Sequence, residues 1–223
     1  EVTKMYRDKL KIILHIYRDK YHGNIIDAFR KYKDIGCIEL LASAATHGYL
    51  PLYEEYPEAL NAQIQQGINT YKRYFGNSPK GFWLPECGYT PVLDEILIKH
   101  NIYYFICESH GIEYAVPRPE YGTYAPICSP RGVVAFGRDQ ESSKQVWSMD
   151  EGYPGDYDYR DFYRDIGYDL DYEYIKPYIL PNGQRTHTGL KYYKITGKTE
   201  DKHIYIPENA IEKASIHAAN FIF

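Results

Sequence analysis

Several residues with acid, base or sugar-stacking side chains follow short apolar segments of this 223-residue chain. They are His47, Glu86, Glu108, His110 and Trp147, with Asp150, Glu151 and Asp156 a little further along. A carboxylate can act as nucleophile, acid or base, an imidazole can exchange hydrogen bonds, and an indole ring can stack on an apolar surface. Cleavage of a glycosidic bond uses a pair of carboxylates. The residue types therefore favour chemistry on a carbohydrate.

The elements that must position these side chains are strands alternating with helices. Apolar runs at 37–41, 81–84 and 102–107 alternate with helical patterns at 57–75 and at about 90–101. This order indicates parallel strands with crossover helices, an α/β fold. Further strands are expected at 124–128, 132–136 and 144–148. In a parallel β/α barrel the carboxyl ends of the strands carry the active site, so the candidates should converge on one mouth.

Each candidate also has an ordinary structural explanation. A single glutamate after a strand, such as Glu86, is usually solvated or caps a helix. A histidine beside a glycine, such as His47 or His110, is more often a hydrogen-bonded structural residue, and Trp147 is more often part of a core. Convergence on one edge is what would favour the catalytic interpretation.

The rest of the chain is expected to complete a single partial domain over residues 1–223. Helical patterns occupy 4–18, 25–32 and 208–222. The segment at about 150–182 is rich in Tyr, Asp and Gly, and we expect a long loop insertion there, with one short helix near 159–165.

The composition excludes some classes of protein. A net charge of −4 argues against a nucleic-acid partner, and no apolar run approaches the length of a membrane span. The four cysteines form no C-x-x-C pair, which indicates free thiols in a cytoplasmic protein, and neither a metal nor a cofactor is expected. The 26 tyrosines suit a surface that stacks sugar rings, although codon bias explains them equally well.

Four separated segments resemble glycoside hydrolase family 57 and occur in the family's order. GFWLPECGY (81–89) resembles its nucleophile region, and SAATHGYLPL (43–52) is similar to the histidine-bearing region upstream. The segment 146–170 looks like the 1,4-α-glucan branching enzyme branch of the family, and THTGLKYYKITG (186–197) continues the match. The resemblance covers the chain from about residue 24 to its end.

The resemblance implies a retaining enzyme on an incomplete (β/α)7 TIM-like barrel with mostly parallel strands, here truncated at both ends. Glu86 would be the catalytic nucleophile and an α-glucan polysaccharide the substrate. The residues expected to bind that substrate are His47, His110, Trp83, Trp147 and Tyr153. The loop around Asp156 and Arg160 would instead be braced by an ion pair between these two residues.

Two departures from the family pattern leave alternatives open. The family's acid/base aspartate belongs to a segment expected beyond Phe223, and its first histidine motif to one before residue 1; Asp156 or Glu108 are weak substitutes for the aspartate. The nearest rivals to branching are an α-amylase or a 4-α-glucanotransferase of the same family. A non-catalytic glucan-binding barrel is a further alternative. A metal-dependent polysaccharide deacetylase is disfavoured, because the chain has no His-x₃₋₅-His pair.

Overall fold

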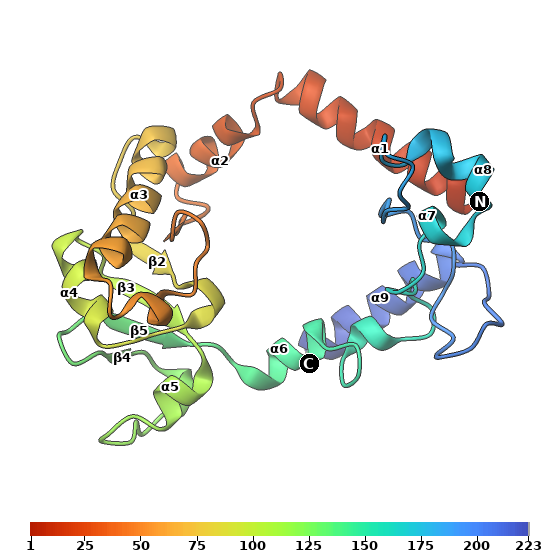
Figure 1. The fold of residues 1–223 in the computed structure, drawn as a ribbon. Coiled ribbons are helices and arrows are strands. Elements are labelled where there is room, and N and C mark those ends of the chain that lie inside the picture. The colour runs from red at the N-terminus through yellow and green to blue at the C-terminus, as the bar shows by residue number, and fades with distance from the viewer. Residues whose placement is uncertain (223) are drawn as a thin grey trace. The chain divides into compact units, whose positions relative to one another are not determined.

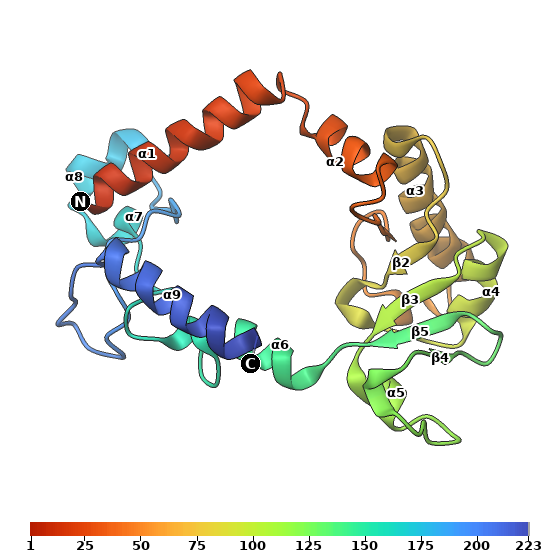
Figure 2. The ribbon, with the colours of Figure 1, turned by 180° about the vertical axis from the view of Figure 1, so that it is seen from behind.

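The computed structural model describes residues 1–222 and divides into two compact units (Figure 1). One unit combines Glu1–Lys20 with the segment that starts at Glu141, and the other is Tyr21–Gln140. The same elements are seen from behind in Figure 2. No helix within residues 1–222 combines the length and the apolar character that crossing a bilayer requires.

The unit Tyr21–Gln140 contains the mostly parallel sheet that the sequence predicts. Its strands are β1 (Ala42–Ser43), β2 (Gly81–Trp83), β3 (Tyr104–Cys107), β4 (Ile127–Cys128) and β5 (Val134–Gly137). Among the described residues the order is β1-β2-β3-β5-β4, and only β4 runs antiparallel to its neighbour. The carboxyl ends of β1, β2, β3 and β5 therefore lie at one edge.

Helices precede and connect these strands. They are α2 (Ile25–Asp34), η2 (Leu50–Tyr53), α3 (Pro57–Phe75), η3 (Pro85–Cys87), α4 (Val92–Lys99), α5 (Ser109–Glu113) and η4 (Gly122–Tyr124). The helix α3 begins with Pro57, whose missing N–H costs nothing at this position. It ends at Gly76, whose φ of 78° is left-handed and suits a residue without Cβ.

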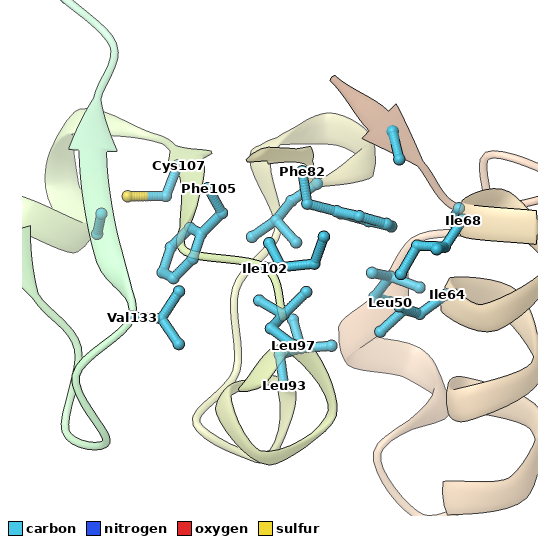
Figure 3. Packing of buried hydrophobic residues seen from close by; sticks show 14 of the residues in the cluster. Leu50, Ile64, Ile68, Phe82, Leu93, Leu97, Ile102, Phe105, Cys107 and Val133 are labelled. Atoms are coloured by element: carbon cyan, nitrogen blue, oxygen red, sulfur yellow. The ribbon is translucent and has the colours of Figure 1, made fainter. Parts of the chain in front are cut away.

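The core of this unit lies between the sheet and the helices α3 and α4 (Figure 3). Ile64 and Ile68 are one helical turn apart and fully buried, and Phe82 and Leu97 are fully buried as well. Burial of each such side chain stabilises the fold by roughly 1.5–3 kcal/mol. Phe82 alternates with Trp83, which is only half-buried, so Trp83 points away from the helix-covered face.

A close contact between α3 and β1 sets the position of the first strand. An added Cβ at Gly67 would lie 1.9 Å from the carbonyl oxygen of Ser43, which leaves no room for any side chain. Next to it, the backbone N–H of Ala45 donates to Gln63 O at 3.0 Å. The chain that leaves β1 is therefore fixed directly to α3.

The other unit consists of helices and irregular chain. Its elements are α1 (Val2–His15), the π-helical turn η1 (Ile16–Lys20), α6 (Gln140–Trp147), η5 (Tyr153–Gly155), α7 (Ile166–Asp169), α8 (Tyr172–Ile175), η6 (Lys176–Tyr178) and α9 (Pro207–Ile222). Gln140, the first residue of α6, belongs to the unit that contains the sheet. Tyr6 of α1 holds the amino-terminal helix in place. Its hydroxyl donates to Lys191 O at 3.1 Å, and it accepts from Lys191 N at 2.9 Å and from Arg160 Nη1 at 2.8 Å.

Three sequence predictions about elements were wrong. The strand expected at 37–41 forms only at Ala42–Ser43, because the residues after α2 first make a turn in which Cys37 N donates to Tyr32 O. The segment 144–148 lies mainly in helix α6 rather than in a strand, and periodicity cannot separate the two for so short an apolar run.

The short helix expected near 159–165 does not form either. Asp161 Oδ1 accepts from Tyr163 N, and Asp165 Oδ1 accepts from Gly167 N, both at 2.9 Å. Such local bonds from aspartate to the backbone compete with a helix. Helix α7 begins only at Ile166, with Asp165 as its N-cap.

Candidate active site

The turn after β2 presents Glu86 through an unusual backbone. The φ angles of Glu86 and Cys87 are 51° and 56°, in the left-handed region that is costly for residues other than glycine. The turn is closed by Cys87 N donating to Leu84 O at 2.9 Å and Gly88 N donating to Pro85 O at 3.1 Å. The Cys87 side chain is buried, while the Glu86 side chain is 76% exposed. Strain of this kind concentrates at functional sites.

Glu86 lies next to His47, which follows the neighbouring strand β1. Atom Nε2 of His47 is 3.5 Å from Oε1 of Glu86. The backbone of His47 is also left-handed, with φ of 55°, and its N–H donates to Ala44 O at 3.2 Å. Gln63 of α3 accepts from the backbone N–H of Thr46 at 3.1 Å, which anchors this loop to the helix. The expected meeting of carboxylate and imidazole at one edge is thus found.

An ion pair occupies the same edge at the ends of β3 and β5. Arg138 Nη1 is 3.3 Å from Glu108 Oε2 and 3.9 Å from Cys87 Sγ. Sequence reasoning named Glu108 but missed Arg138. The signal was present, because Arg138 lies two residues after the strand predicted at 132–136. Glu86 lies equally far after the run at 81–84, so the rule that selected it applies to Arg138 as well.

The two cysteines at this edge are buried thiols. Burial raises the pKa of Cys87, partly offset by the hydrogen bond from Arg138, and the nearby carboxylates of Glu108 and Glu86 raise it further. Burial, followed by the neighbouring Cys87 and Glu108, raises the pKa of Cys107 to about 11. Both thiols therefore stay protonated at neutral pH.

The other predicted site residues of this unit lie at the end of β2 and in the helix that follows β3. Trp83 ends β2, and its carbonyl oxygen accepts from Ser43 Oγ at 3.0 Å, which ties the ends of β1 and β2 together. His110 is exposed in α5, two residues after Glu108. The Tyr49 ring covers Gly88, where an added Cβ would lie 2.3 Å from the ring.

Trp147 and Tyr153 belong to the other unit. Trp147 is 83% exposed at the end of α6, and with Phe162 and Tyr205 it lines a cavity of about 950 Å³. The ring of Tyr153 stacks on His217, with centroids 4.4 Å apart, and its hydroxyl donates to Asn220 Oδ1 at 2.6 Å.

The expected Asp156–Arg160 ion pair is not formed. Asp156 instead contacts His217 Nε2 at 3.4 Å and Lys213 Nζ at 3.7 Å. Arg160 stacks over the rings of Tyr6 and Tyr205.

The sequence profile of glycosyl hydrolase family 57 matches residues 6–222. The chain belongs to this family. A family 57 relative, the 1,4-α-glucan branching enzyme from Thermococcus kodakarensis, is 33% identical over 92% of the chain and 32% of its own length. A probable branching enzyme from Mycobacterium tuberculosis is 31% identical over 85% of the chain and 31% of its own length. The family 57 chain thus spans about a third of the curated relatives that it matches.

Solved structures give the same assignment. An α-amylase from Thermotoga maritima superposes with a TM-score of 0.89 at 47% identity, covering 99% of this chain and 43% of that one. The family 57 branching enzyme from T. kodakarensis, solved with glucose, superposes with a TM-score of 0.73 at 33% identity, covering 92% of this chain and 39% of that one. The family 57 branching enzyme from Pyrococcus horikoshii superposes with a TM-score of 0.70 at 34% identity, covering 92% of this chain and 37% of that one. The resemblance seen in the four sequence segments is confirmed.

Proposed function

We propose that this family 57 chain carries Glu86 as the nucleophile of a retaining enzyme that acts on α-glucan. The observation that supports the assignment most directly is the 3.5 Å contact between Glu86 and His47 at the carboxyl edge of parallel strands. The exposure of the Glu86 carboxylate leaves it accessible to a sugar, and its strained turn fixes the direction in which it points.

In the proposed mechanism the ionised Glu86 attacks the anomeric carbon and forms a covalent glycosyl-enzyme. His47 hydrogen-bonds hydroxyl groups of the sugar at the cleavage point. A second carboxyl group, about 5–5.5 Å from the first, protonates the leaving oxygen and then activates the acceptor. The resemblance assigns that group to an aspartate outside these 223 residues.

We propose that the sheet is part of an incomplete (β/α)7 barrel and that both compact units belong to one catalytic domain. The parallel order of β1, β2, β3 and β5 supports this architecture. The side chains proposed to contact the glucan are His47, His110, Trp83, Trp147 and Tyr153. The exposed ring of Trp147 supports a stacking role, because a core tryptophan would be covered.

Branching is the proposed reaction, in which the glycosyl group passes to a 6-hydroxyl of another glucan chain. Its support is the match to branching enzymes of two organisms at 33–34% identity over 92% of the chain. The α-amylase reaction is the second candidate, because the T. maritima α-amylase is 47% identical over 99% of the chain. The 4-α-glucanotransferase reaction is the third candidate.

Assays on amylose with the complete protein distinguish the candidates. Branching creates α-1,6 linkages, so iodine staining falls and debranching releases short chains, while reducing ends stay nearly constant. An amylase increases reducing ends, and a glucanotransferase changes chain lengths without branches. A protein that binds glucan but shows none of these activities would be the non-catalytic alternative.

The variant Glu86→Gln tests the nucleophile. We expect it to lose activity by at least about 10³-fold, since the amide cannot form the glycosyl-enzyme, while glucan binding is retained. Glu95→Gln, an exposed carboxylate on α4 paired with Arg131, is the matched control and should behave like wild type. Near wild-type turnover in Glu86→Gln would eliminate the assignment.

A further inference from the structure

Arg138 has a backbone position fixed by the sheet. The pair Cys107–Gly137 ends the β3–β5 register, and Arg138 N donates to Cys107 O at 3.0 Å. Side chains alternate between the faces of a strand. An added Cβ on Gly137 would lie 2.8 Å from Ile112 of α5, so position 137 faces the helices. Arg138 therefore projects to the opposite face, the one that Trp83 of β2 also occupies.

The guanidinium of Arg138 connects the loops that follow two neighbouring strands. Its Nη1 reaches Glu108 Oε2, after β3, at 3.3 Å, and Cys87 Sγ, after β2, at 3.9 Å. Cys87 is the residue directly after Glu86, and its side chain is 4% exposed. One cation thus contacts both the buried anchor of the nucleophile turn and a carboxylate of the adjacent loop.

Stability does not account for this arrangement. The Arg138 and Glu108 side chains are 38% and 33% exposed, and solvent screens an ion pair of that exposure. The turn beside it has two consecutive left-handed residues, a conformation that persists only when its surroundings hold it. Two backbone hydrogen bonds close the turn, and Cys87 adds a buried side chain to them, whereas Glu86 itself extends into solvent.

We propose that Arg138 is a positioning residue for Glu86, holding the strained Glu86–Cys87 turn through the Cys87 thiol and the Glu108 carboxylate. It acts on the nucleophile through its neighbours and does not touch the reacting atoms. The proposal rests on the nucleophile role proposed above for Glu86. A displacement of the nucleophile of about 1 Å is enough to lower the rate roughly 10²-fold.

The test compares Arg138→Met with Arg131→Met in the complete protein. Arg131 forms an exposed ion pair with Glu95 in the same unit and serves as the matched control. We expect Arg138→Met to lower kcat roughly 10- to 100-fold with KM within about twofold of wild type. Covalent labelling of Glu86 by a fluorinated glycosyl fluoride should slow by the same factor. Arg138→Lys should restore part of kcat, since an ammonium keeps the positive charge but ends a side chain of different length and shape.

Three outcomes would overturn the proposal. The first is a kcat for Arg138→Met no lower than for Arg131→Met. The second is a raised KM with unchanged kcat, which would show direct substrate binding. The third is a Lys variant as impaired as the Met variant. Should Arg138→Met not fold, Arg138→Gln is measured against the same criteria. Activity in Glu86→Gln would refute the proposed function itself, whereas an inactive Glu86→Gln with a fully active Arg138→Met refutes only the role of Arg138.

Discussion

His47 and Glu86 both have left-handed backbones, with φ of 55° and 51°, and their side chains meet at 3.5 Å. Each residue lies in the loop after its own parallel strand. Because neither is a glycine, both loops are held in conformations that cost free energy. The two strained residues follow adjacent strands, β1 and β2, and their side chains, a carboxylate and an imidazole, contact each other.

Gly88→Ala should lower activity without unfolding the protein. The added methyl group would lie 2.3 Å from the ring of Tyr49, so the exposed ring or the Glu86 turn must move. We expect kcat/KM to fall about 10-fold or more, with a loss of stability of about 1–3 kcal/mol at most. The measurement is steady-state kinetics on amylose beside a thermal melt. Gly111→Ala, whose methyl would meet only Cys107 Sγ at 3.8 Å, is the control, and equal activities of the two variants would contradict the prediction.

Asp165→Asn should destabilise the protein. The fully buried carboxylate accepts from Gly167 N, from the backbone and hydroxyl of Thr188, and from Gly189 N, at 2.8–3.0 Å. An amide replaces one acceptor oxygen by a donor that faces other donors. The expected loss in the free energy of unfolding is about 1–3 kcal/mol, measured by urea denaturation. Asp8→Asn, an exposed residue of α1, should have no measurable effect.

The same carboxylate makes stability depend on pH. Burial alone raises the pKa of Asp165, but the hydrogen bonds from Thr188, Gly167 and Gly189 outweigh it and hold the pKa below the ordinary value of 3.8. A lowered folded-state pKa contributes stability that is present above pH 3.8 and is lost as pH falls through the folded value. The wild-type free energy of unfolding should therefore fall more steeply below about pH 4 than that of Asp165→Asn. Parallel slopes would contradict this.

Alkylation should separate the four cysteines into two classes. Cys37 and Cys128 are exposed, whereas Cys87 and Cys107 are buried, with pKa values raised first by burial. The thiolate is the reactive form, so iodoacetamide at pH 8 should label the exposed pair at least about 10-fold faster. Mass spectrometry of the digested protein measures this, and urea-unfolded protein, in which all four should react alike, is the control. Fast labelling of Cys87 in the folded protein would be inconsistent with the structure.

The sequence predicts best where one pattern decides the structure. The apolar run before Pro85 was predicted as a strand and forms β2, and the strand-end rule then brought Glu86 to the same edge as His47. The helix from Pro57 to Phe75 was predicted with its observed bounds, because a first-turn proline and a terminal glycine mark its ends. These features are local, and local signals can be read without knowing the fold.

Prediction failed where tertiary contacts decide. The run around Val146 is as compatible with a helix as with a strand, and it forms helix α6. The side chains of Asp161 and Asp165 accept hydrogen bonds from the backbone N–H groups of Tyr163 and Gly167. The residue spacing within 159–165 does not predict these bonds. Arg138 follows a predicted strand, but its contact with Cys87 joins residues 51 positions apart that only the sheet brings within reach.

Helix α3 lies against β1 with no side chain between them, since Gly67 almost touches the Ser43 carbonyl. Ser43 is the last residue of β1, and the loop that carries His47 starts directly after it. Any residue larger than glycine at 67 would force the helix or the strand to move, because its Cβ would lie 1.9 Å from the Ser43 carbonyl oxygen. An amino acid that has no side chain thereby decides how closely α3 and the strand before the His47 loop can approach each other.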